Sequence, residues 1–223
     1  MRVVVSVGGS VLAPDLDPDR VAAYAAALDE AVEAGHEIGV VVGGGPVARE
    51  YIEAARELDT TEVELDRLGI GVTHLNARLL RAALDAPSAR TDGYEASVEA
   101  MAAGRVPVMG GVAPGQTTDA VAAALAEDAR ADLLLFATSV DGVYDVDPTA
   151  DGEAVRFDEL TPGELVDVVA PMSRSAGASA PVDLLAAKLV ERAGLRALVV
   201  DGIDPETVRR AIVDGEFDGT EVR

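Results

Sequence analysis

The stretch Val40-Val41-Val42-Gly43-Gly44-Gly45-Pro46-Val47-Ala48-Arg49 decides the fold class of this chain. Its three β-branched residues predict the end of a buried strand, and its three glycines predict a tight turn. The proline predicts the start of a helix, because its missing N–H costs nothing in the first helical turn. A strand, a glycine turn and a helix N-terminus direct backbone amides toward one point, which suits a phosphate group. A turn without a ligand is the alternative, but similar glycine turns at Gly8-Gly9-Ser10 and Gly110-Gly111 favour phosphate binding.

On both sides of this stretch, apolar strand-like runs alternate with amphipathic helix-like runs. Strands are predicted at residues 2–7, 37–42, 106–109, 133–137 and 197–200 and near Thr220, and helices at residues 17–35, 46–58, 61–84, 94–103, 118–129, 182–193 and 205–213. This alternation predicts an α/β fold: a three-layer sandwich with a mainly parallel central sheet covered by helices on both faces. The glycine turns at strand ends predict ligand binding at the carboxyl edge of that sheet. No linker or repeat divides the chain, so residues 1–223 are expected to form a single domain.

Three local motifs predict details of this fold. Thr118 or Asp119 is the expected N-cap of the helix after the third glycine turn. Asp141-Gly142 is a hairpin-turn signal. Thr161-Pro162-Gly163-Glu164 is typical of a capping box with proline at the first helical position.

The composition is strongly acidic, with 40 Asp and Glu residues against 18 Lys and Arg and a formal net charge of −22. Hydrophobic residues make up 49% of the 223-residue chain, which allows a full core and excludes an acidic disordered protein. Surface carboxylates repel one another, and about 1 M salt screens that repulsion by shortening the Debye length to roughly 3 Å. We therefore expect a protein adapted to a high-salt cytoplasm. We expect no nucleic-acid partner, because nucleic-acid binding needs a basic face.

The chain has no cysteine and no apolar run near the ~18 residues of a membrane span. Its first residues run directly into a glycine turn, so we expect that they are not a signal peptide. We expect a soluble, cytoplasmic protein without disulfides, thiolate metal sites or a membrane partner. The two histidines, His36 and His74, are far apart in the sequence and are interpreted as helix residues without a catalytic role.

Several catalytic motifs are absent from the sequence. It lacks the P-loop pattern GxxxxGK[ST], the dinucleotide-binding pattern GxGxxG and the hydrolase elbow GxSxG. What remains is a site of backbone amides, small hydroxyls, a few arginines and carboxylates. Such a site suits phosphoryl transfer, in which the protein contributes positioning and charge neutralisation.

Four segments, in this order, resemble the amino-acid kinase family: 7–10 (VGGS), 43–49 (GGGPVAR), 114–119 (PGQTTD) and 138–144 (TSVDGVY). Segments 66–70 and 183–188 add to the resemblance, which runs from the first strand to the C-terminus. Within the family, the chain is similar to the archaeal UMP kinases. The resemblance implies the amino-acid kinase (carbamate kinase-like) fold and transfer of the γ-phosphoryl group of ATP to UMP, giving UDP and ADP in pyrimidine nucleotide (CTP) biosynthesis.

The resemblance also implies roles for individual residues. Asp119, which would organise the transfer site, and Arg49 are the expected catalytic residues. The expected ATP-binding residues are Gly9, Ser10, Gly45, Arg49, Thr138, Tyr144 and Asp147. The expected UMP-binding residues are Gly44, Asp66, Pro114, Gly115, Gln116, Thr117, Thr118, Asp119 and Ala120. No residue is expected to bind a metal directly, because Mg²⁺ would be carried by ATP.

For the whole chain, the resemblance implies that the two parts of the chain mainly bind different nucleotides. The N-terminal part would mainly bind UMP and form subunit contacts, and the C-terminal part would mainly bind ATP. A homohexamer with UTP as a feedback inhibitor is the implied assembly.

One position departs from the family pattern. The family often carries a lysine on the first strand, two residues before the glycine pair, and this chain has Ser6 there. Our hypothesis is that Arg49 neutralises the transferred group instead, because it is the only cation directly beside a glycine turn. Lys188 is a weaker candidate, since a lone helix lysine usually pairs with a nearby acid such as Glu191.

Alternatives stay open at this point. Arg49 is otherwise a solvated helix residue, Asp66 a surface carboxylate and Tyr144 a core aromatic. The alternative functions are another kinase of the same fold, acting on isopentenyl phosphate, acetylglutamate or carbamate, and a non-catalytic nucleotide- or oxyanion-binding protein. The missing first-strand lysine favours the last of these.

Overall fold

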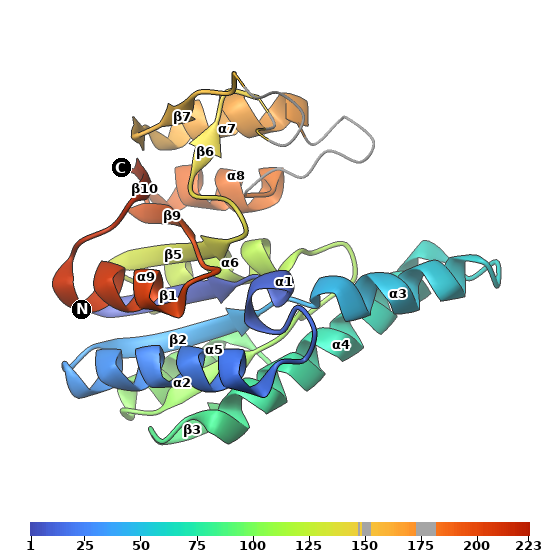
Figure 1. The fold of residues 1–223 in the computed structure, drawn as a ribbon, viewed down its shortest axis with the longest axis horizontal. Coiled ribbons are helices and arrows are strands. Elements are labelled where there is room, and N and C mark those ends of the chain that lie inside the picture. Colours follow the sequence, from blue (N-terminus) through green and yellow to red (C-terminus); the bar gives the residue numbers. More distant parts are fainter. Residues whose placement is uncertain (147, 149–152, 173–181) are drawn as a thin grey trace.

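In a computed structural model, which describes residues 1–146, 148, 153–172 and 182–223, one large β-sheet runs through the molecule (Figure 1). Among these residues its eight strands are, in spatial order, β3 (Ser88–Arg90), β4 (Val106–Met109), β2 (Glu37–Val42), β1 (Arg2–Val7), β5 (Leu133–Thr138), β9 (Ala197–Asp201), β10 (Gly219–Val222) and β8 (Glu159–Leu160). Neighbouring strands are parallel except β9 and β10. The predicted α/β fold with a mainly parallel sheet is confirmed.

The pairing register of this sheet places the ends of three strands side by side. Val7, the last residue of β1, pairs with Val42 of β2 and with Ala137 of β5. Since these strands are parallel, the turns that follow them meet at the same edge of the sheet. The first two glycine turns and the segment after Thr138 therefore converge there.

Helices cover both faces of the sheet, as the three-layer prediction requires (Figure 1). One layer contains α2 (Pro18–Glu33), α4 (Glu62–Ala83), α9 (Pro205–Arg209) and the π-helical turn η1 (Arg210–Asp214). The other layer contains α5 (Tyr94–Ala102), α6 (Thr118–Ala129), α7 (Pro162–Met172) and α8 (Leu184–Ala193). Val3 and Val5 of β1 pack against the first layer and Val4 against the second, which reflects the alternation of side chains along a strand.

Helices α3 (Gly45–Arg56) and α1 (Gly9–Leu12) and strands β6 (Val143–Tyr144) and β7 (Arg156–Phe157) lie beside the sandwich. Helix α3 packs against α4, and Figure 1 shows the two helices extending beyond the sheet. Helix α1 is a single turn after β1. Strands β6 and β7 form a separate antiparallel pair.

Most predicted elements are confirmed with nearly the predicted bounds. Strands 2–7, 37–42 and 106–109 agree residue for residue. The capping box is also present: the backbone N–H of Thr161 donates to the carboxylate of Glu164 at 2.7 Å, and the N–H of Glu164 donates to Oγ1 of Thr161 at 3.3 Å. These features are encoded locally, so sequence patterns reveal them.

Three local predictions were wrong. The N-cap of α6 is Thr117 instead of Thr118 or Asp119, because Oγ1 of Thr117 accepts a hydrogen bond from the N–H of Ala120 at 3.1 Å. Asp141-Gly142 makes no hairpin, because β5 pairs with β1 and β9 while β6 pairs with β7. The predicted helix 205–213 ends its α-helical part at Arg209 and continues as a π-helical turn.

Strands β3, β6, β7 and β8 and helix α1 have no counterpart among the predicted elements. Each has only two to four residues, too few to show a period of 2 or 3.6 residues in the sequence.

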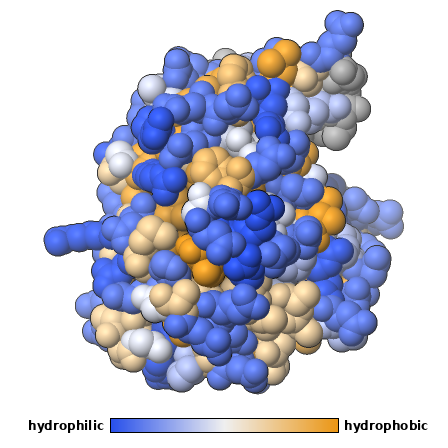
Figure 2. Space-filling view, turned by 60° about the vertical axis from the view of Figure 1, so that its left-hand side comes forward, coloured by the Kyte–Doolittle hydropathy of each residue, from blue (hydrophilic) through white to orange (hydrophobic). Residues whose placement is uncertain are grey.

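The face of the molecule shown in Figure 2 is mostly hydrophilic, with small separate hydrophobic patches. This agrees with the formal net charge of −22. In the described ranges, no helix has both the length and the apolar character needed to cross a membrane.

Candidate phosphoryl-transfer site

The first two glycine turns are held in place by the strands that precede them. The backbone N–H of Gly8 donates to the carbonyl oxygen of Ala137 at 3.1 Å, and the N–H of Gly43 donates to the carbonyl oxygen of Val7 at 2.9 Å. Both turns are thus anchored to the carboxyl edge of the sheet.

These two turns also pack backbone against backbone. A Cβ atom on Gly9 would lie 2.5 Å from the carbonyl oxygen of Gly43, and one on Gly45 would lie 2.5 Å from the carbonyl carbon of Gly9. Gly45 has a φ of +66°, a conformation that L side chains rarely adopt. Glycine is therefore required at these positions for two reasons: the close approach of the turns and the backbone conformation of Gly45.

Two buried polar residues of α4 support the glycine turns. Nδ2 of Asn76 donates to the carbonyl oxygens of Gly43 at 2.9 Å and Gly44 at 3.2 Å. Oγ1 of Thr73 accepts the N–H of Gly111 at 2.7 Å. Sequence reasoning did not identify either residue. The sequence pattern that could have indicated them is a polar residue on the inward-facing side of the predicted helix 61–84.

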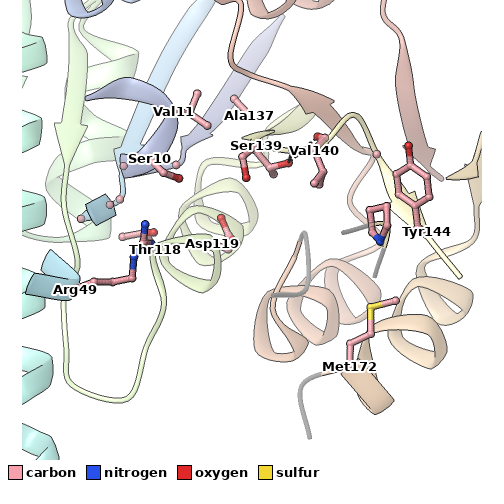
Figure 3. A pocket seen from close by; sticks show the side chains of 18 of the residues that line it. Ser10, Val11, Arg49, Thr118, Asp119, Ala137, Ser139, Val140, Tyr144 and Met172 are labelled. Atoms are coloured by element: carbon pink, nitrogen blue, oxygen red, sulfur yellow. Dashed lines mark hydrogen bonds between the residues drawn. The ribbon is translucent and has the colours of Figure 1, made fainter. Parts of the chain in front are cut away.

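A cavity of about 300 Å³, here called cavity A, opens beside the first two glycine turns (Figure 3). Figure 3 shows Ser10, Arg49 and Thr118 toward one end and Tyr144 and Met172 toward the other. Among the predicted ATP-binding residues, cavity A is lined by Gly9, Ser10, Gly45, Arg49, Thr138 and Tyr144. The predicted Asp147 lies outside the described residues.

A second cavity of about 290 Å³, cavity B, lies on the other side of the triple glycine. Among the predicted UMP-binding residues, it is lined by Gly44, Asp66, Gln116, Thr117 and Thr118. The two cavities share four lining residues: Gly44, Gly45, Arg49 and Thr118. The triple-glycine turn and the first turn of α6 therefore form the boundary between them.

Four predicted UMP-binding residues do not line cavity B: Pro114, Gly115, Asp119 and Ala120, of which Asp119 lines cavity A. Pro114 and Gly115 are exposed, and Ala120 is buried with its N–H committed to the cap of α6. Asp66 fixes the loop that contains Pro114 and Gly115, because its Oδ2 accepts the backbone N–H of Gly115 at 2.8 Å. Asp66 is thus more than a free surface carboxylate.

Asp119, on the first turn of α6, lines cavity A. Its Oδ1 accepts a hydrogen bond from the hydroxyl of Ser6 at 2.7 Å, and Ser6 is buried on β1. Burial raises the pKa of Asp119 to about 7, and the hydrogen bond from Ser6 and the nearby charge of Asp183 modify it less. The residue that replaces the first-strand lysine therefore contacts the predicted organising aspartate directly.

Asp183 links the N-termini of two helices at this site. Its Oδ1 caps α8 by accepting the N–H groups of Leu185 at 2.7 Å and Ala186 at 3.1 Å. Its Oδ2 accepts the hydroxyl of Thr117, the N-cap residue of α6. The sequence motif contained Asp183, but no role had been predicted for it.

The two candidate cations differ in position. Arg49 borders both cavities, and it takes part in none of the ion pairs found among the described residues. Lys188 instead pairs with Glu191 on the surface of α8, with Nζ 3.0 Å from Oε2. The predicted pairing of Lys188 is confirmed, and Arg49 is the cation that reaches the boundary.

Metal ligands do not cluster in the part of the chain that the structure describes: no group of three or more His, Asp or Glu side chains could hold an ion. His74 uses Nε2 in a 2.8 Å contact with the carbonyl oxygen of Gly111, and Nδ1 of His36 lies 3.2 Å from the N-terminal nitrogen. The geometry suits chemistry by amides, hydroxyls, one arginine and one carboxylate.

Comparisons with known proteins agree with this geometry. Residues 1–201 match the model of the amino acid kinase family. A uridylate kinase of Halorubrum lacusprofundi is 64% identical over 100% of this chain and 93% of its own length, and one of Haloarcula marismortui is 60% identical over 100% and 98%. The crystal structure of a uridylate kinase from Archaeoglobus fulgidus superposes with a TM-score of 0.90 at 42% identity, covering 100% of both chains.

Proposed function

The chain belongs to the amino acid kinase family, and we propose that it transfers the γ-phosphoryl group of ATP to UMP, giving UDP and ADP for pyrimidine nucleotide synthesis. The observation that carries this proposal is the boundary shared by two cavities of similar size. A phosphoryl group must pass between two nucleotides held on either side of one point. Gly44, Gly45, Arg49 and Thr118 border both sides of such a point.

Cavity A is the proposed ATP site. The glycine turns and Ser10 at one end would hold the phosphates, and Thr138 and Tyr144 would line the adenosine end. Backbone amides bind phosphate without adding side-chain cations, which suits a chain with a single lysine. Asp147 completes the proposed set from the resemblance.

Cavity B is the proposed UMP site. Gly44 and Thr118 would approach the UMP phosphate, and Asp66 would face the ribose or base while holding the 114–117 loop. All described lining residues of cavity B fall between positions 44 and 118. This supports the proposal that the N-terminal part mainly binds UMP. The proposed ATP site draws on both parts, with the glycine turns from the N-terminal part and Thr138, Tyr144 and Met172 from the C-terminal part.

The proposed reaction needs little acid or base catalysis from protein side chains. The attacking oxygen of UMP belongs to an ionised phosphate, so no general base is needed, and catalysis depends on positioning and charge neutralisation. Arg49 would neutralise the transferred group, and Asp119 would orient the groups around it. Mg²⁺ would enter as part of the ATP substrate, where it offsets the repulsion between two anions.

A turnover assay tests this function. Purified protein in concentrated KCl is given Mg·ATP with UMP, CMP, AMP or isopentenyl phosphate, and ADP release and the phosphorylated product are measured. Preferential conversion of UMP to UDP is expected. Preferential turnover of another acceptor would indicate a different kinase of this fold. ATP binding without turnover would support a non-catalytic binding protein.

We also propose that the protein assembles into a cytoplasmic homohexamer inhibited by UTP. The outer face of α4 supports assembly, because Leu68, Leu75 and Leu79 are exposed there and Gly71 faces open space. Light scattering in concentrated KCl measures the assembly. Initial rates with added UTP measure the inhibition.

A further inference from the structure

A network around Arg156 borders the ATP side of the molecule. Nη1 of Arg156, on β7, lies 3.0 Å from Oδ2 of Asp141, and Nη2 lies 2.6 Å from Oδ1 of Asp218. A third carboxylate, Asp158, lies 3.9 Å from Nη2. The guanidinium thus joins the turn after β5 to the segment that precedes β10.

The same network reaches a wall of cavity A through Asp141. The hydroxyl of Tyr144 donates to Oδ1 of Asp141 at 2.6 Å, while Arg156 holds Oδ2 of the same carboxylate. Tyr144 lines the end of cavity A opposite Arg49 (Figure 3). One carboxylate therefore connects Arg156 to this ring.

The backbone around the network is tightly packed. Gly142 has a φ of +153°, and a Cβ atom there would lie 2.7 Å from Oγ1 of Thr220 and 2.8 Å from Cδ of Arg156. Oγ1 of Thr220, which is fully buried on β10, also accepts the N–H of Val143 at 2.8 Å. The Tyr144 segment is thus pinned between the Arg156 side chain and the C-terminal strand.

Electrostatics reinforce this arrangement. The hydrogen bond from Tyr144, together with the Arg156 guanidinium, outweighs burial and holds the pKa of Asp141 below its ordinary value. The same hydrogen bond to Asp141 raises the pKa of Tyr144 above its ordinary value. At neutral pH, an ionised Asp141 therefore accepts from a protonated Tyr144 and from Arg156 together.

We infer that Arg156 is a positioning residue for the nucleotide, which holds Asp141 and thereby fixes the Tyr144 ring at the far end of cavity A. This inference rests on the proposed function, in which ATP occupies cavity A with its phosphates at the glycine turns. Arg156 itself does not line the cavity. Replacing Arg156 is therefore expected to weaken binding of the base end of ATP. It is expected to leave the binding of the phosphates and of UMP unchanged.

The chain offers a matched control in Arg209 of α9. Arg209 also lies among three carboxylates, those of Glu30, Glu206 and Asp214. Its side chain is 19% exposed, against 25% for Arg156, and it does not line cavity A. Arg209→Gln therefore removes a comparable ion cluster far from the nucleotide.

Binding calorimetry in concentrated KCl separates a positioning role from a general charge effect. Mg·ATP and inorganic tripolyphosphate are each titrated into the wild type, Arg156→Gln and Arg209→Gln. We expect Arg156→Gln to weaken ATP binding about tenfold and tripolyphosphate binding less than about twofold, and Arg209→Gln to change neither. If Arg156→Gln weakened the binding of ATP and of tripolyphosphate equally, the inference would be contradicted. Such a result would indicate a general charge effect, because loss of a distant positive charge also weakens phosphate binding.

Steady-state kinetics give a second, independent readout. Arg156→Gln should raise KM for ATP about fivefold or more, with kcat and KM for UMP within about twofold of wild type. Arg156→Lys keeps the charge but cannot contact Asp141 and Asp218 together. Its KM for ATP should lie between those of the wild type and Arg156→Gln. Adding Tyr144→Phe to Arg156→Gln should cost less than the sum of the single effects, because both act on one contact.

The outcomes distinguish this inference from the proposed function. A wild type that binds ATP but phosphorylates no UMP would overturn the function, while the calorimetric comparison would still decide the role of Arg156. If Arg156→Gln does not fold, Arg156→Lys and Asp141→Asn give the same comparison. An unchanged ATP affinity in folded variants would overturn the inference.

Discussion

At the residue scale, the contact between Ser6 and Asp119 is the main departure from the family pattern. A lysine at position 6 would place a positive charge beside the carboxylate, whereas serine supplies only a hydrogen bond. Burial then raises the pKa of Asp119 to about 7. The carboxylate at the transfer site is therefore costly to ionise in the free protein.

This cost predicts a pH-dependent effect of Asp119→Asn on stability. The pKa of Asp119 rises from 3.8 to about 7 on folding, so the folded wild type loses stability relative to the unfolded chain as the pH rises through this range. Asparagine does not titrate, and its side-chain oxygen can still accept a hydrogen bond from the hydroxyl of Ser6. The stability difference in favour of Asp119→Asn should increase by about 1 kcal/mol or more between pH 4 and pH 8.

Chemical unfolding of both proteins in concentrated KCl across this pH range measures the difference. Other titrating groups are common to the two chains and cancel. A difference that stays constant from pH 4 to pH 8 would show that Asp119 keeps its ordinary pKa. The variant should also lose most of its activity, because it lacks the carboxylate at the transfer site.

Arg49 provides a second prediction at the residue scale. It borders both cavities without a carboxylate partner in the described part of the chain, so it is free to contact the transferred group. Arg49→Ala should lower kcat more than about tenfold, or ~1.4 kcal/mol, with little change in thermal stability. Arg56, on the same helix and paired with Glu62, is the control. A loss below tenfold, or an equal loss in Arg56→Ala, would remove Arg49 from the catalytic set.

At the scale of elements, the site depends on two turns and the helix that supports them. The turn after β1 and the turn after β2 touch through their glycines, and α4 holds the second turn through Asn76. Each turn alone is a common strand-to-helix connection. Their contact makes a single surface of backbone amides.

Asn76→Ala tests the support from α4. Without the amide, the buried carbonyl oxygens of Gly43 and Gly44 lose a hydrogen-bond donor, so unfolding should become easier by about 1–3 kcal/mol. KM for both nucleotides should rise, because this turn borders both cavities. Arg78→Ala, at an exposed position two residues further along α4, is the control and should change neither quantity. Unaltered stability of Asn76→Ala would mean that the strands alone fix the turn.

At the scale of the whole molecule, the charge balance dominates. A formal net charge of −22 on 223 residues makes the folded chain repel itself in dilute buffer. Many arginines in the described part of the chain form local ion pairs, such as those around Arg156 and Arg209. These pairs offset only part of the repulsion.

Stability should therefore depend strongly on salt. Lowering KCl from about 3 M to 0.1 M lengthens the Debye length to about 10 Å and should lower the melting temperature or dissociate the subunits. Circular dichroism and light scattering across the series measure both effects. Full stability and unchanged mass in dilute buffer would remove the interpretation of a high-salt protein.

The sequence alone determined the layered α/β fold, most element bounds and the presence of three glycine turns, because periodicity, capping and glycine chemistry are local properties. The family motifs likewise named residues that line both cavities, Gly45, Arg49 and Thr118 among them.

Only the tertiary structure decided how these pieces meet. The packing of Gly9 on Gly45, the bonds from Asn76 and Ser6, and the Arg156 network join residues far apart in the sequence. The short strands were also missed, because segments of two or three residues show no periodicity. Local patterns do not encode these contacts, because they depend on how distant segments pack. The glycine turns meet because the register of the parallel sheet brings the ends of β1, β2 and β5 to one edge.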